Sequence, residues 1–436
     1  MFDSTVPVRA DVWGGPFAEC FDADFLSRVY GREHRVFRGA PDRFSGVLDW
    51  RVMGTILACH RLDPLRMFLA DQGRPVPARS YTRAHTDRRG KTRTRLEPER
   101  LYAALSSGAT LVVNAVDELH PPAGALAAGL ERLLKTGVQV NAYASWTARE
   151  GLGTHRDDHD VVVCQLHGSK RWRVYDPTEQ WWIPVEAGGE PESAPTTPID
   201  EFVLSAGDVL YLPRGFWHAV AASEGTASLH LTCGPNANTG IDLSRWLLDG
   251  LRRREAMRAD LPRFRSPEEQ SAYLEQWRQE ILAELSDPDV LQRFFAERDA
   301  ALPARLGLSL PHVDGVPADP ALRVRLLAPL ARLSRTGDDA LVVAADGVEL
   351  VLTSPGVEEA LAPLLHGRTC SLAELAAAAT LPVPQVAVLL TGLVARGIVE
   401  LASPVSAEEA QLPAAERSGT SGPPAPAVAA KGLRRS

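Results

Sequence analysis

The chain lacks the features that mark secreted or membrane-embedded proteins. Its five cysteines, Cys20, Cys59, Cys164, Cys233 and Cys370, are odd in number and widely spaced, so they form neither a disulfide framework nor a CxxC metal knuckle. No apolar run reaches the roughly 18 residues that a membrane span needs. The first residues, MFDSTVPVRADVWGG, have no basic segment followed by an apolar core. These absences predict a cytoplasmic protein without a membrane partner.

An excess of positive charge is also missing. The chain holds 47 basic and 55 acidic residues, a formal net charge of −8, which argues against nonspecific binding to nucleic acid, although a local basic patch stays open. The arginine runs HTDRRGKTRTR and LRRREAMR could contact RNA or an acidic peptide. Their ordinary interpretations are a solvated loop and an exposed helix face. Nucleic acid is therefore not an expected partner.

The chain does contain a clear order of periodic segments. A length of 436 residues predicts several domains. Apolar spacing is helical up to about residue 69. Residues 70–100 are polar and rich in Pro and Arg, as in a loop or edge region. Short alternating runs, typical of an antiparallel sandwich or barrel, fill Val138–Cys233. Helical spacing then returns from Asp242 to about Arg305, and a strand, turn, strand and helix pattern with the outline of a winged helix follows. The predicted fold class is α+β, with units at 1–100, 101–240, 241–315, 316–405 and a disordered tail at 406–436.

Several ionisable side chains crowd together in GTHRDDHD, residues 153–160, just before the apolar run VVVCQL. Such a cluster indicates either a solvated turn or a bound cation, because unpaired charge is costly to bury. On a strand, His155 and Asp157 would share one face about 6.6 Å apart and could reach one metal ion. His159 would lie roughly 13 Å from His155, too far to join them. A third ligand has to come from elsewhere.

An HxD pair alone is weak as a motif, and the same spacing occurs in the Pro/Gly-rich joint at His312–Asp314. The context of the first pair is stronger, because about sixty residues later GDVLYLPRGFWHAV places His218 at the start of another predicted strand. A barrel strand returning beside the first could direct this imidazole at the same ion. Two histidines and one carboxylate leave three metal positions open, the arrangement of iron(II) oxygenases.

The segments VNAYASWTAREGLGTHRDDHDVVVCQLHGSKRWRVYDP, GDVLYLPRGFWHAV and SLHLTCG together resemble the JmjC-type cupin family of ribosomal oxygenases, which are iron(II)- and 2-oxoglutarate-dependent protein hydroxylases. The resemblance implies a double-stranded β-helix (jelly-roll) barrel with N-terminal helices, a helical dimerisation region and a C-terminal winged-helix domain. It implies that His155, Asp157 and His218 form the catalytic iron site. It further implies that Lys170 pairs with the distal carboxylate of 2-oxoglutarate. The cosubstrate-binding positions that it adds are Asn141, Tyr143 and Thr232.

The residues themselves agree with this role for Lys170. A dicarboxylate in a half-dry barrel needs a cation at the end that the metal does not hold, and a buried lysine without such a ligand is costly. Lysine is scarce among the 47 basic residues, although a surface lysine at a strand start is the alternative interpretation. Four residues are candidates for orienting the metal ligands, and each is also typical of a solvent-facing or structural position: Asp158, His159, Asp160 and His230.

The predicted function is an oxygenase that hydroxylates a side chain, arginine or histidine, of a protein or peptide substrate such as a ribosomal protein. Small-molecule oxidation and methyl-lysine demethylation remain alternatives, because the loop SWTAREGLG differs from relatives at the substrate entrance. A cupin ligand sensor with a DNA-binding winged helix is an alternative of another class, disfavoured by the almost wholly apolar and uncharged PVPQVAVLLTGLVARG helix. Trp181, Trp182 and Trp217 could line a peptide groove or pack a barrel rim. A homodimer is expected through the helical region that holds Trp246, Leu247, Leu248, Phe294 and Phe295.

Overall fold

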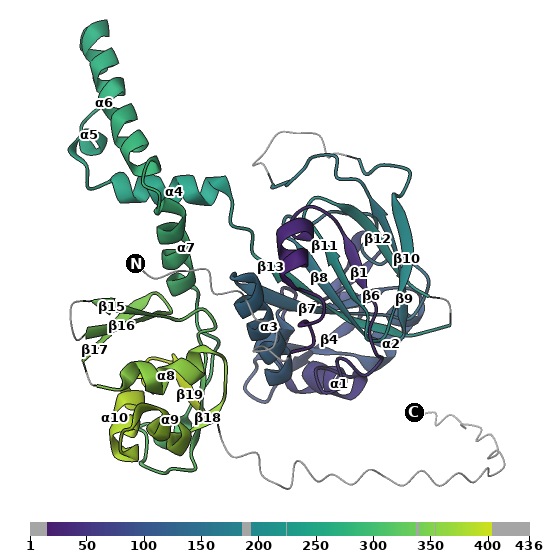
Figure 1. Ribbon diagram of the computed structural model, residues 1–436. Coiled ribbons are helices and arrows are strands. Elements are labelled where there is room, and N and C mark those ends of the chain that lie inside the picture. Colours follow the sequence, from purple (N-terminus) through teal and green to yellow (C-terminus); the bar gives the residue numbers. More distant parts are fainter. Residues whose placement is uncertain (1–14, 185–192, 224, 337–339, 354, 403–436) are drawn as a thin grey trace, which may run out of the picture.

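The computed structural model describes residues 15–184, 193–223, 225–336, 340–353 and 355–402. Figure 1 shows three parts along the chain: a β-barrel flanked by helices, a helical arm, and a smaller C-terminal unit. The predicted disordered tail at 406–436 lies outside the described residues.

Two antiparallel sheets form the barrel. The larger has the order β1-β11-β8-β13-β7-β6-β2-β3, with β1 (Arg35–Phe37), β2 (Met67–Asp71), β3 (Arg74–Val76), β6 (Thr110–Val113), β7 (Val138–Ser145), β8 (Val161–His167), β11 (Val209–Leu212) and β13 (Ser228–Pro235). The smaller has the order β10-β9-β12, with β9 (Ser169–Tyr175), β10 (Asp200–Ser205) and β12 (Trp217–Ala222). The antiparallel barrel predicted from the short alternating runs is confirmed.

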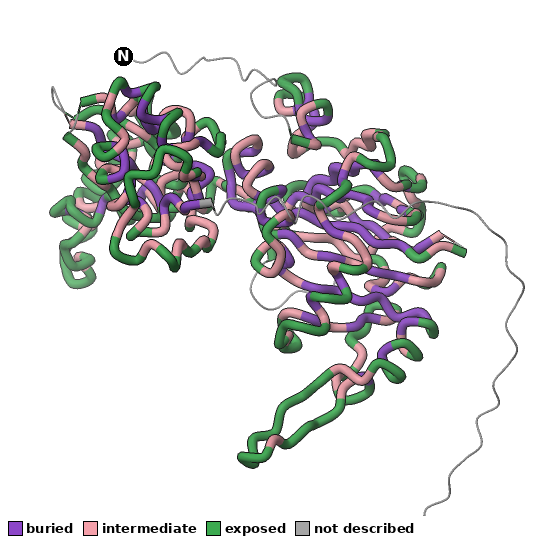
Figure 2. Tube along the Cα trace, turned by 90° about the horizontal axis from the view of Figure 1, so that it is seen from below, coloured by how far each residue is buried: buried purple, intermediate pink, exposed green. Residues whose placement is uncertain are grey.

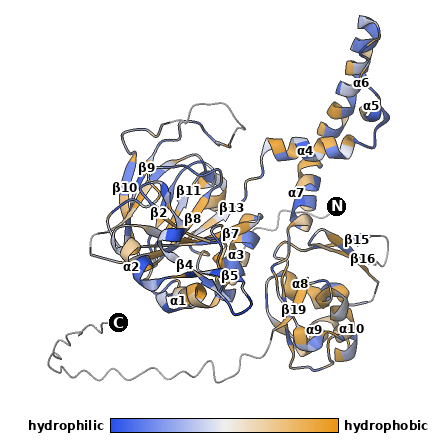
Figure 3. Cartoon of the chain, turned by 180° about the vertical axis from the view of Figure 1, so that it is seen from behind, coloured by the Kyte–Doolittle hydropathy of each residue, from blue (hydrophilic) through white to orange (hydrophobic). Residues whose placement is uncertain are grey.

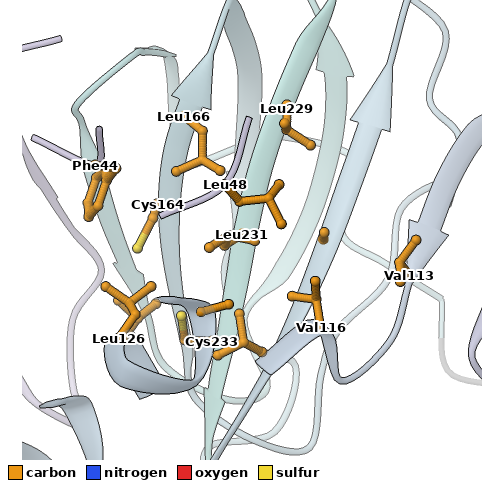
Figure 4. Packing of buried hydrophobic residues seen from close by; sticks show 14 of the residues in the cluster. Phe44, Leu48, Val113, Val116, Leu126, Cys164, Leu166, Leu229, Leu231 and Cys233 are labelled. Carbon is orange, nitrogen blue, oxygen red and sulfur yellow. The ribbon is translucent and has the colours of Figure 1, made fainter. Parts of the chain in front are cut away.

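Strand alternation divides the side chains of the large sheet between two environments. On β13, Leu229, Leu231 and Cys233 belong to the main hydrophobic core, whereas His230 and Thr232 line a pocket inside the barrel. Figure 4 shows Leu229, Leu231 and Cys233 beside Cys164 and Leu166 of β8, with Leu126 of a helix close by. Because both faces are covered, every residue of β13 is buried.

Helices cover the outer face of the large sheet (Figure 1). They are a short π-helix (Phe25–Val29), α1 (Trp50–Cys59), α2 (Pro98–Ser106) and α3 (Pro121–Leu134), with 3-10 turns at Ala78–Ser80 and Val116–Glu118. Asp49 caps α1 by accepting a hydrogen bond from Val52 N at 2.7 Å, and proline occupies the first turn of α2 and of α3. Within the range up to residue 69 where helical spacing predicted helices, the structure has the π-helix and α1 but also β1 and the start of β2, because these short strands pair into the large sheet.

Residues 70–100, predicted to be a loop or edge region, form strands rather than a loop. The segment contains β3 at the edge of the large sheet and a separate hairpin of β4 (Thr82–Thr86) and β5 (Thr92–Leu96). Threonines recur along both strands and favour extended backbone. Asp87 closes the turn because its carboxylate accepts hydrogen bonds from Arg89 N at 2.8 Å and Lys91 N at 3.0 Å. High polarity in this segment thus marks an exposed β-ribbon rather than a structureless loop.

The arm consists of α4 (Gly240–Leu251), α5 (Glu255–Arg258), α6 (Pro267–Leu285) and α7 (Val290–Ala301), with a 3-10 turn at Leu310–His312 after it. Thr239 and Ser266 form capping boxes with Asp242 and Glu269 at the starts of α4 and α6. None of the 19 residues of α6 is buried. Figure 1 shows α6 extending away from both the barrel and the C-terminal unit.

The C-terminal unit has its own core around Leu361, Leu375 and Leu390. Its elements are β14 (Arg323–Leu326), β15 (Arg332–Thr336), β16 (Ala340–Ala345), β17 (Val348–Leu352), α8 (Val357–Leu365), β18 (Cys370–Ser371), α9 (Leu372–Ala379), α10 (Val383–Val394) and β19 (Val399–Ala402). The strands form two sheets, β18-β14-β19 and β15-β16-β17. The predicted order of strand, turn, strand, three helices and a closing strand is thus observed.

Arg305 joins the chain after α7 to the barrel. Its guanidinium donates to Asp117 at 2.8 Å, to Glu131 at 2.7 Å and to the carbonyl of Val138 at 2.9 Å. Both carboxylates are almost fully buried, and Glu131 also accepts a hydrogen bond from Val138 N. This cluster fixes the end of the arm against α3 and β7.

Among the described residues, no single helix is both long and apolar enough to cross a membrane; α9 and α10 reach that length only together, with a 109° bend between them.

Candidate metal and cosubstrate site

His155 and His218 are held together by the backbone. They form an isolated antiparallel bridge in which His155 N donates to His218 O at 3.0 Å and His218 N donates to His155 O at 2.8 Å. His218 is the second residue of β12, whereas His155 and Asp157 precede β8 in a loop rather than on a regular strand. The backbone of Asp157 is fixed in turn, since its carbonyl accepts from Gly215 N at 3.0 Å. Long-range pairing therefore brings the third predicted ligand to the HxD pair.

The three side chains offer one donor atom each, and these atoms lie within 4.8 Å of one another. Nδ1 of His155 lies 3.1 Å from Gly153 O, and Nδ1 of His218 lies 3.2 Å from Phe216 O. A ring that donates from Nδ1 to these carbonyls presents Nε2 as the ligand atom. Among the described residues this is the only such group of histidine, cysteine or acidic side chains, and the second HxD pair at His312–Asp314 does not form one.

The imidazole of His218 is neutral rather than one half of an ion pair. Burial, followed by the charge of His155, lowers the pKa of His218 to about 4. Its Nε2 lies 3.7 Å from the Asp157 carboxylate, which is too long for a hydrogen bond. A neutral imidazole beside a carboxylate is the donor set that a divalent metal needs.

Asp160 supports the loop that carries the ligands. Its buried carboxylate accepts hydrogen bonds from the Tyr211 hydroxyl and from Arg214 N, and Arg214 directly precedes the Gly215–His218 segment. His159 lies beside Gly234, where an added Cβ would come 2.8 Å from its ring, and Asp158 is exposed. Of the candidates for orienting the ligands, Asp160 is the one with clear contacts to the loop.

The triad opens into a small pocket inside the barrel. The lining residues come from both sheets and from the loop before β8: Thr110, Tyr143, Gly151, Leu152, Gly153, His155, Asp157, Val161, Lys170, Trp172, His218, Val220, His230 and Thr232. The pocket thus contains the triad and three of the four predicted cosubstrate positions.

Lys170 reaches this pocket from β9 as a buried, unpaired cation. The residue is only 3% exposed, and burial lowers the pKa of its ammonium group to about 7. No hydrogen bond or ion pair joins Lys170 to another residue in the described part of the chain. The neighbouring Trp172 Nε1 and His230 Nδ1 are also buried without a partner. A cation and two unused polar atoms around one cavity fit an anionic ligand that extends away from the metal.

Tyr143 and Thr232 line the pocket as predicted, while Asn141 does not. The side chain of Asn141 accepts hydrogen bonds from Ala115 N at 2.9 Å and from Gln139 at 3.0 Å. Burial raises the pKa of Tyr143 to about 12, so its hydroxyl remains a hydrogen-bond donor, and its ring stacks on His230 with centroids 5.0 Å apart. These contacts place Asn141 behind the pocket and Tyr143 within it.

Sequence reasoning missed several lining residues. Thr110 comes from β6, far from the motifs, and Gly151 must be small because an added Cβ would lie 2.1 Å from Thr110 Oγ1. Trp172 and Val220 carried a usable signal, since each lies two residues beyond Lys170 or His218 on its strand and so faces the same way. Thr110 had no such local signal.

The predicted tryptophan cluster lies around Arg156, which belongs to the loop that carries His155 and Asp157. The Arg156 guanidinium sits 4.1 Å from the centre of the Trp182 ring and 4.8 Å from that of Trp217. Trp217 is nearly buried and donates to Thr178, whereas Trp181 is largely exposed and donates to Gly31 O. Within this cluster, Trp217 is therefore packed against the protein, whereas Trp181 is exposed to solvent.

A double-stranded antiparallel barrel with two histidines and an aspartate at its mouth defines a class of metal-binding cupin-like proteins. Residues 122–243 match the model of the JmjC domain family. Ribosomal oxygenase 2 of Rattus norvegicus is 37% identical over 135 residues, which make up 29% of this chain and 28% of the rat protein. The bifunctional lysine-specific demethylase and histidyl-hydroxylase NO66 of Drosophila persimilis is 38% identical over 96 residues, 22% of this chain and 14% of that protein. The chain therefore spans less than a third of the length of these curated relatives.

The X-ray structure of E. coli ycfD is similar over a longer stretch. It is 20% identical, with a TM-score of 0.55, and the match covers 87% of this chain and 97% of that chain. At this identity the likeness shows a shared fold. Residues 122–243 are thus similar to the JmjC domain family, within a chain whose fold is similar to that of E. coli ycfD.

Proposed function

We propose that this protein is an iron(II)- and 2-oxoglutarate-dependent oxygenase that hydroxylates a side chain of a protein or peptide. The observation that carries the proposal is one pocket with a His-Asp-His triad at its mouth and a buried, unpaired lysine within it. Related names support it: two relatives are a ribosomal oxygenase and a histidyl-hydroxylase, and the similar E. coli YcfD has been solved with cobalt and 2-oxoglutarate and with cobalt and succinic acid.

In this proposal, His155, Asp157 and His218 would hold the iron. Iron, when bound together with 2-oxoglutarate and O₂, would supply oxidative decarboxylation, in which one oxygen atom of O₂ enters succinate and the other is inserted into a substrate C–H bond, with release of CO₂. The Lys170 ammonium group pairs with the far carboxylate of the cosubstrate, and the hydroxyls of Tyr143 and Thr232 orient it. Asn141 acts indirectly, because its side chain accepts a hydrogen bond from Ala115 N and so fixes the backbone there.

The pocket walls control access. Val161, Trp172 and Val220 line the cavity with apolar surface, which limits water around the reacting groups. Gly151–Gly153 border the same pocket, so the loop before His155 controls entry of the substrate. The polypeptide positions one C–H bond of the substrate and excludes the others.

The proposed target is an arginine or histidine side chain, with a ribosomal protein as the substrate class that the relatives' names favour. Demethylation of methyl-lysine, which one relative's name includes, and oxidation of a small molecule are the alternative outcomes. The DNA-binding sensor is disfavoured because α10 carries no basic residue within Val383–Val394.

The test is an anaerobic titration of metal-free protein with Fe(II) and 2-oxoglutarate, followed by visible absorption. We expect a weak charge-transfer band in the wild type and in H312A, which removes the histidine of the other HxD pair, and no band in H218A. Lys170→Met should still bind Fe(II) but require at least tenfold more 2-oxoglutarate, because the carboxylate partner is lost. A wild type that binds Fe(II) without a band at saturating 2-oxoglutarate would reject the proposal in favour of another metal function.

We further propose the division into units at 1–100, 101–240, 241–315, 316–405 and 406–436, with a winged-helix domain after the arm. The observed strand and helix order in the C-terminal unit and its separate core support that boundary. The arm is proposed as the homodimer interface, and the cytoplasm as the location of the protein.

A further inference from the structure

The β4–β5 hairpin concentrates positive charge in an acidic protein. Residues 82–96 hold six basic side chains and one acidic one, against a net charge of −8 for the chain. All six, Arg83, Arg88, Arg89, Lys91, Arg93 and Arg95, are exposed. Figure 2 shows a long hairpin in the exposed colour projecting from the barrel, and Figure 3 shows strongly hydrophilic ribbon at β5.

The strand register places the charge on one face. Arg83 lies opposite Arg95 and His85 opposite Arg93, and these four residues share a face because cross-strand partners and residues two apart point the same way. The other face carries threonines and Ala84, and its Thr86 and Thr92 hydroxyls lie 3.0 Å apart in a hydrogen bond. The hairpin therefore has one basic face, which we call the arginine face (Arg83, His85, Arg93 and Arg95), and one neutral face.

This arrangement is unfavourable for the isolated hairpin. Like charges directly opposite one another on a β-ladder are destabilising. Within the described residues, the one ion pair of the arginine face is between Arg93 and Asp87 at 3.9 Å, and Arg83 and Arg95 make none. Folding stability does not explain why these positions are basic. Binding of a polyanion would turn the repulsion into attraction.

The chemistry of the arginine face fits a nucleic acid better than an acidic peptide. Protein interfaces rely on buried aromatic or apolar anchors, and residues 82–95 contain no Phe, Tyr, Trp or large aliphatic side chain. Arginine forks bind phosphate groups with two hydrogen bonds each. The face has His85 as its one ring and so lacks the series of ring platforms on which successive bases of a single strand stack, which makes the phosphates of a helical backbone the matching target.

We propose that the arginine face of the β4–β5 hairpin binds the phosphate backbone of double-helical RNA. The choice of RNA rests on the proposed function, because a ribosomal-protein substrate lies next to folded RNA. The hairpin would hold the enzyme on its target independently of the metal pocket.

The experiment measures binding of metal-free wild type to a short fluorescent RNA duplex by anisotropy, over a series of salt concentrations. Arg83→Gln with Arg95→Gln should weaken binding at least tenfold at low salt and reduce the slope of log K against log salt by about 2. The matched control, Arg253→Gln with Arg258→Gln, removes two exposed arginines of the arm and should change affinity less than twofold.

Orientation is tested on neighbouring residues of one strand. R95E should weaken binding much more than T94E, since Thr94 points to the neutral face. Thermal unfolding checks the fold: removal of Arg83 and Arg95 should leave the melting temperature unchanged or raise it, because a like-charge pair is lost.

Three outcomes would overturn the proposal: no RNA binding at low salt, equal loss with the arm control, or tighter binding of a DNA duplex than of the RNA. Preference for poly-glutamate over RNA would assign the face to an acidic protein instead. Because binding is measured without iron, failure here leaves the charge-transfer test intact, and failure of that test leaves the RNA measurement intact.

Discussion

Lys170 is the residue in which folding and the proposed chemistry conflict most directly. A charged ammonium group in an apolar barrel is disfavoured unless a counter-ion joins it, and the structure supplies none from the described residues. Burial lowers the pKa of this lysine to about 7 from an ordinary value near 10.5. The unpaired Lys170 thus lowers the stability of the ligand-free protein, and binding of a dicarboxylate ligand would remove this penalty.

Lys170→Met should stabilise the ligand-free protein. Between about pH 7 and 10 the unfolded chain holds a proton that folded Lys170 has lost, so wild-type stability rises with pH in this window. The variant lacks this penalty and should be more stable by about 1–4 kcal/mol at pH 7, with the difference shrinking toward pH 10. Urea unfolding at several pH values measures it.

Lys91→Met is the control for this comparison, since Lys91 is exposed and should shift stability little at any pH. A Lys170 variant less stable than wild type at pH 7 would mean that the ammonium group already has a favourable partner.

At the scale of elements, the sequence predicted what local periodicity can carry. The apolar run VVVCQL lies in β8, the alternation in KRWRVY lies in β9, and the helical spacing from Asp242 to about Arg305 corresponds to the helices of the arm. By contrast, local periodicity predicted that His155 and Asp157 share one face of a strand. Both residues instead lie in a loop whose shape depends on the bridge to His218. Pairing of segments sixty residues apart is not encoded in any local period.

The same limit explains the other differences. Asn141 matched a family position, yet Ala115 and Gln139 engage its side chain, and no spacing within VNAY indicates that contact. The β4–β5 hairpin was hidden by its charge, since arginine and threonine alternate there without an apolar face. A strand that buries nothing has no hydrophobic signal by which to recognise it.

Arg305→Ala should destabilise the protein by about 3–5 kcal/mol, because it leaves the carboxylates of Asp117 and Glu131 buried without their cation. Burial already raises the pKa of Glu131 despite the neighbouring guanidinium. Chemical denaturation of the full chain measures the loss, with Arg253→Ala as a control at an exposed arginine. A change below 1 kcal/mol would show that the cluster does not hold the arm to the barrel.

At the scale of the whole molecule, the arm exposes more apolar surface than an isolated chain tolerates well. Its exposed side chains include Leu261, Phe264, Leu274, Trp277, Leu282, Leu285, Leu291 and Phe295, and Figure 3 shows hydrophobic colour along the arm. Of the residues predicted for an interface, Leu247 and Phe294 pack inside the arm while Leu248 and Phe295 face outward. Many exposed apolar side chains on one element are typical of a protein interface.

We expect a homodimer, with a mass of about twice the 47.2 kDa of one chain in size-exclusion chromatography with light scattering. Leu274→Glu should shift the dissociation constant at least tenfold, since burying a leucine contributes about 1.5–3 kcal/mol. Gln276→Glu adds the same charge two residues away on α6 and should have a smaller effect. A monomer at all concentrations would remove the proposed role of the arm.

The cluster around Arg305 also constrains how this protein can change over evolutionary time. Its cation comes from one side of the arm and its two carboxylates from the other, so neither half carries a balanced set. A recombination event that replaced the barrel alone, or grafted a new C-terminal unit after α7, would inherit an orphaned charge. The two parts are therefore expected to be transmitted as a single heritable block, even though each has its own hydrophobic core.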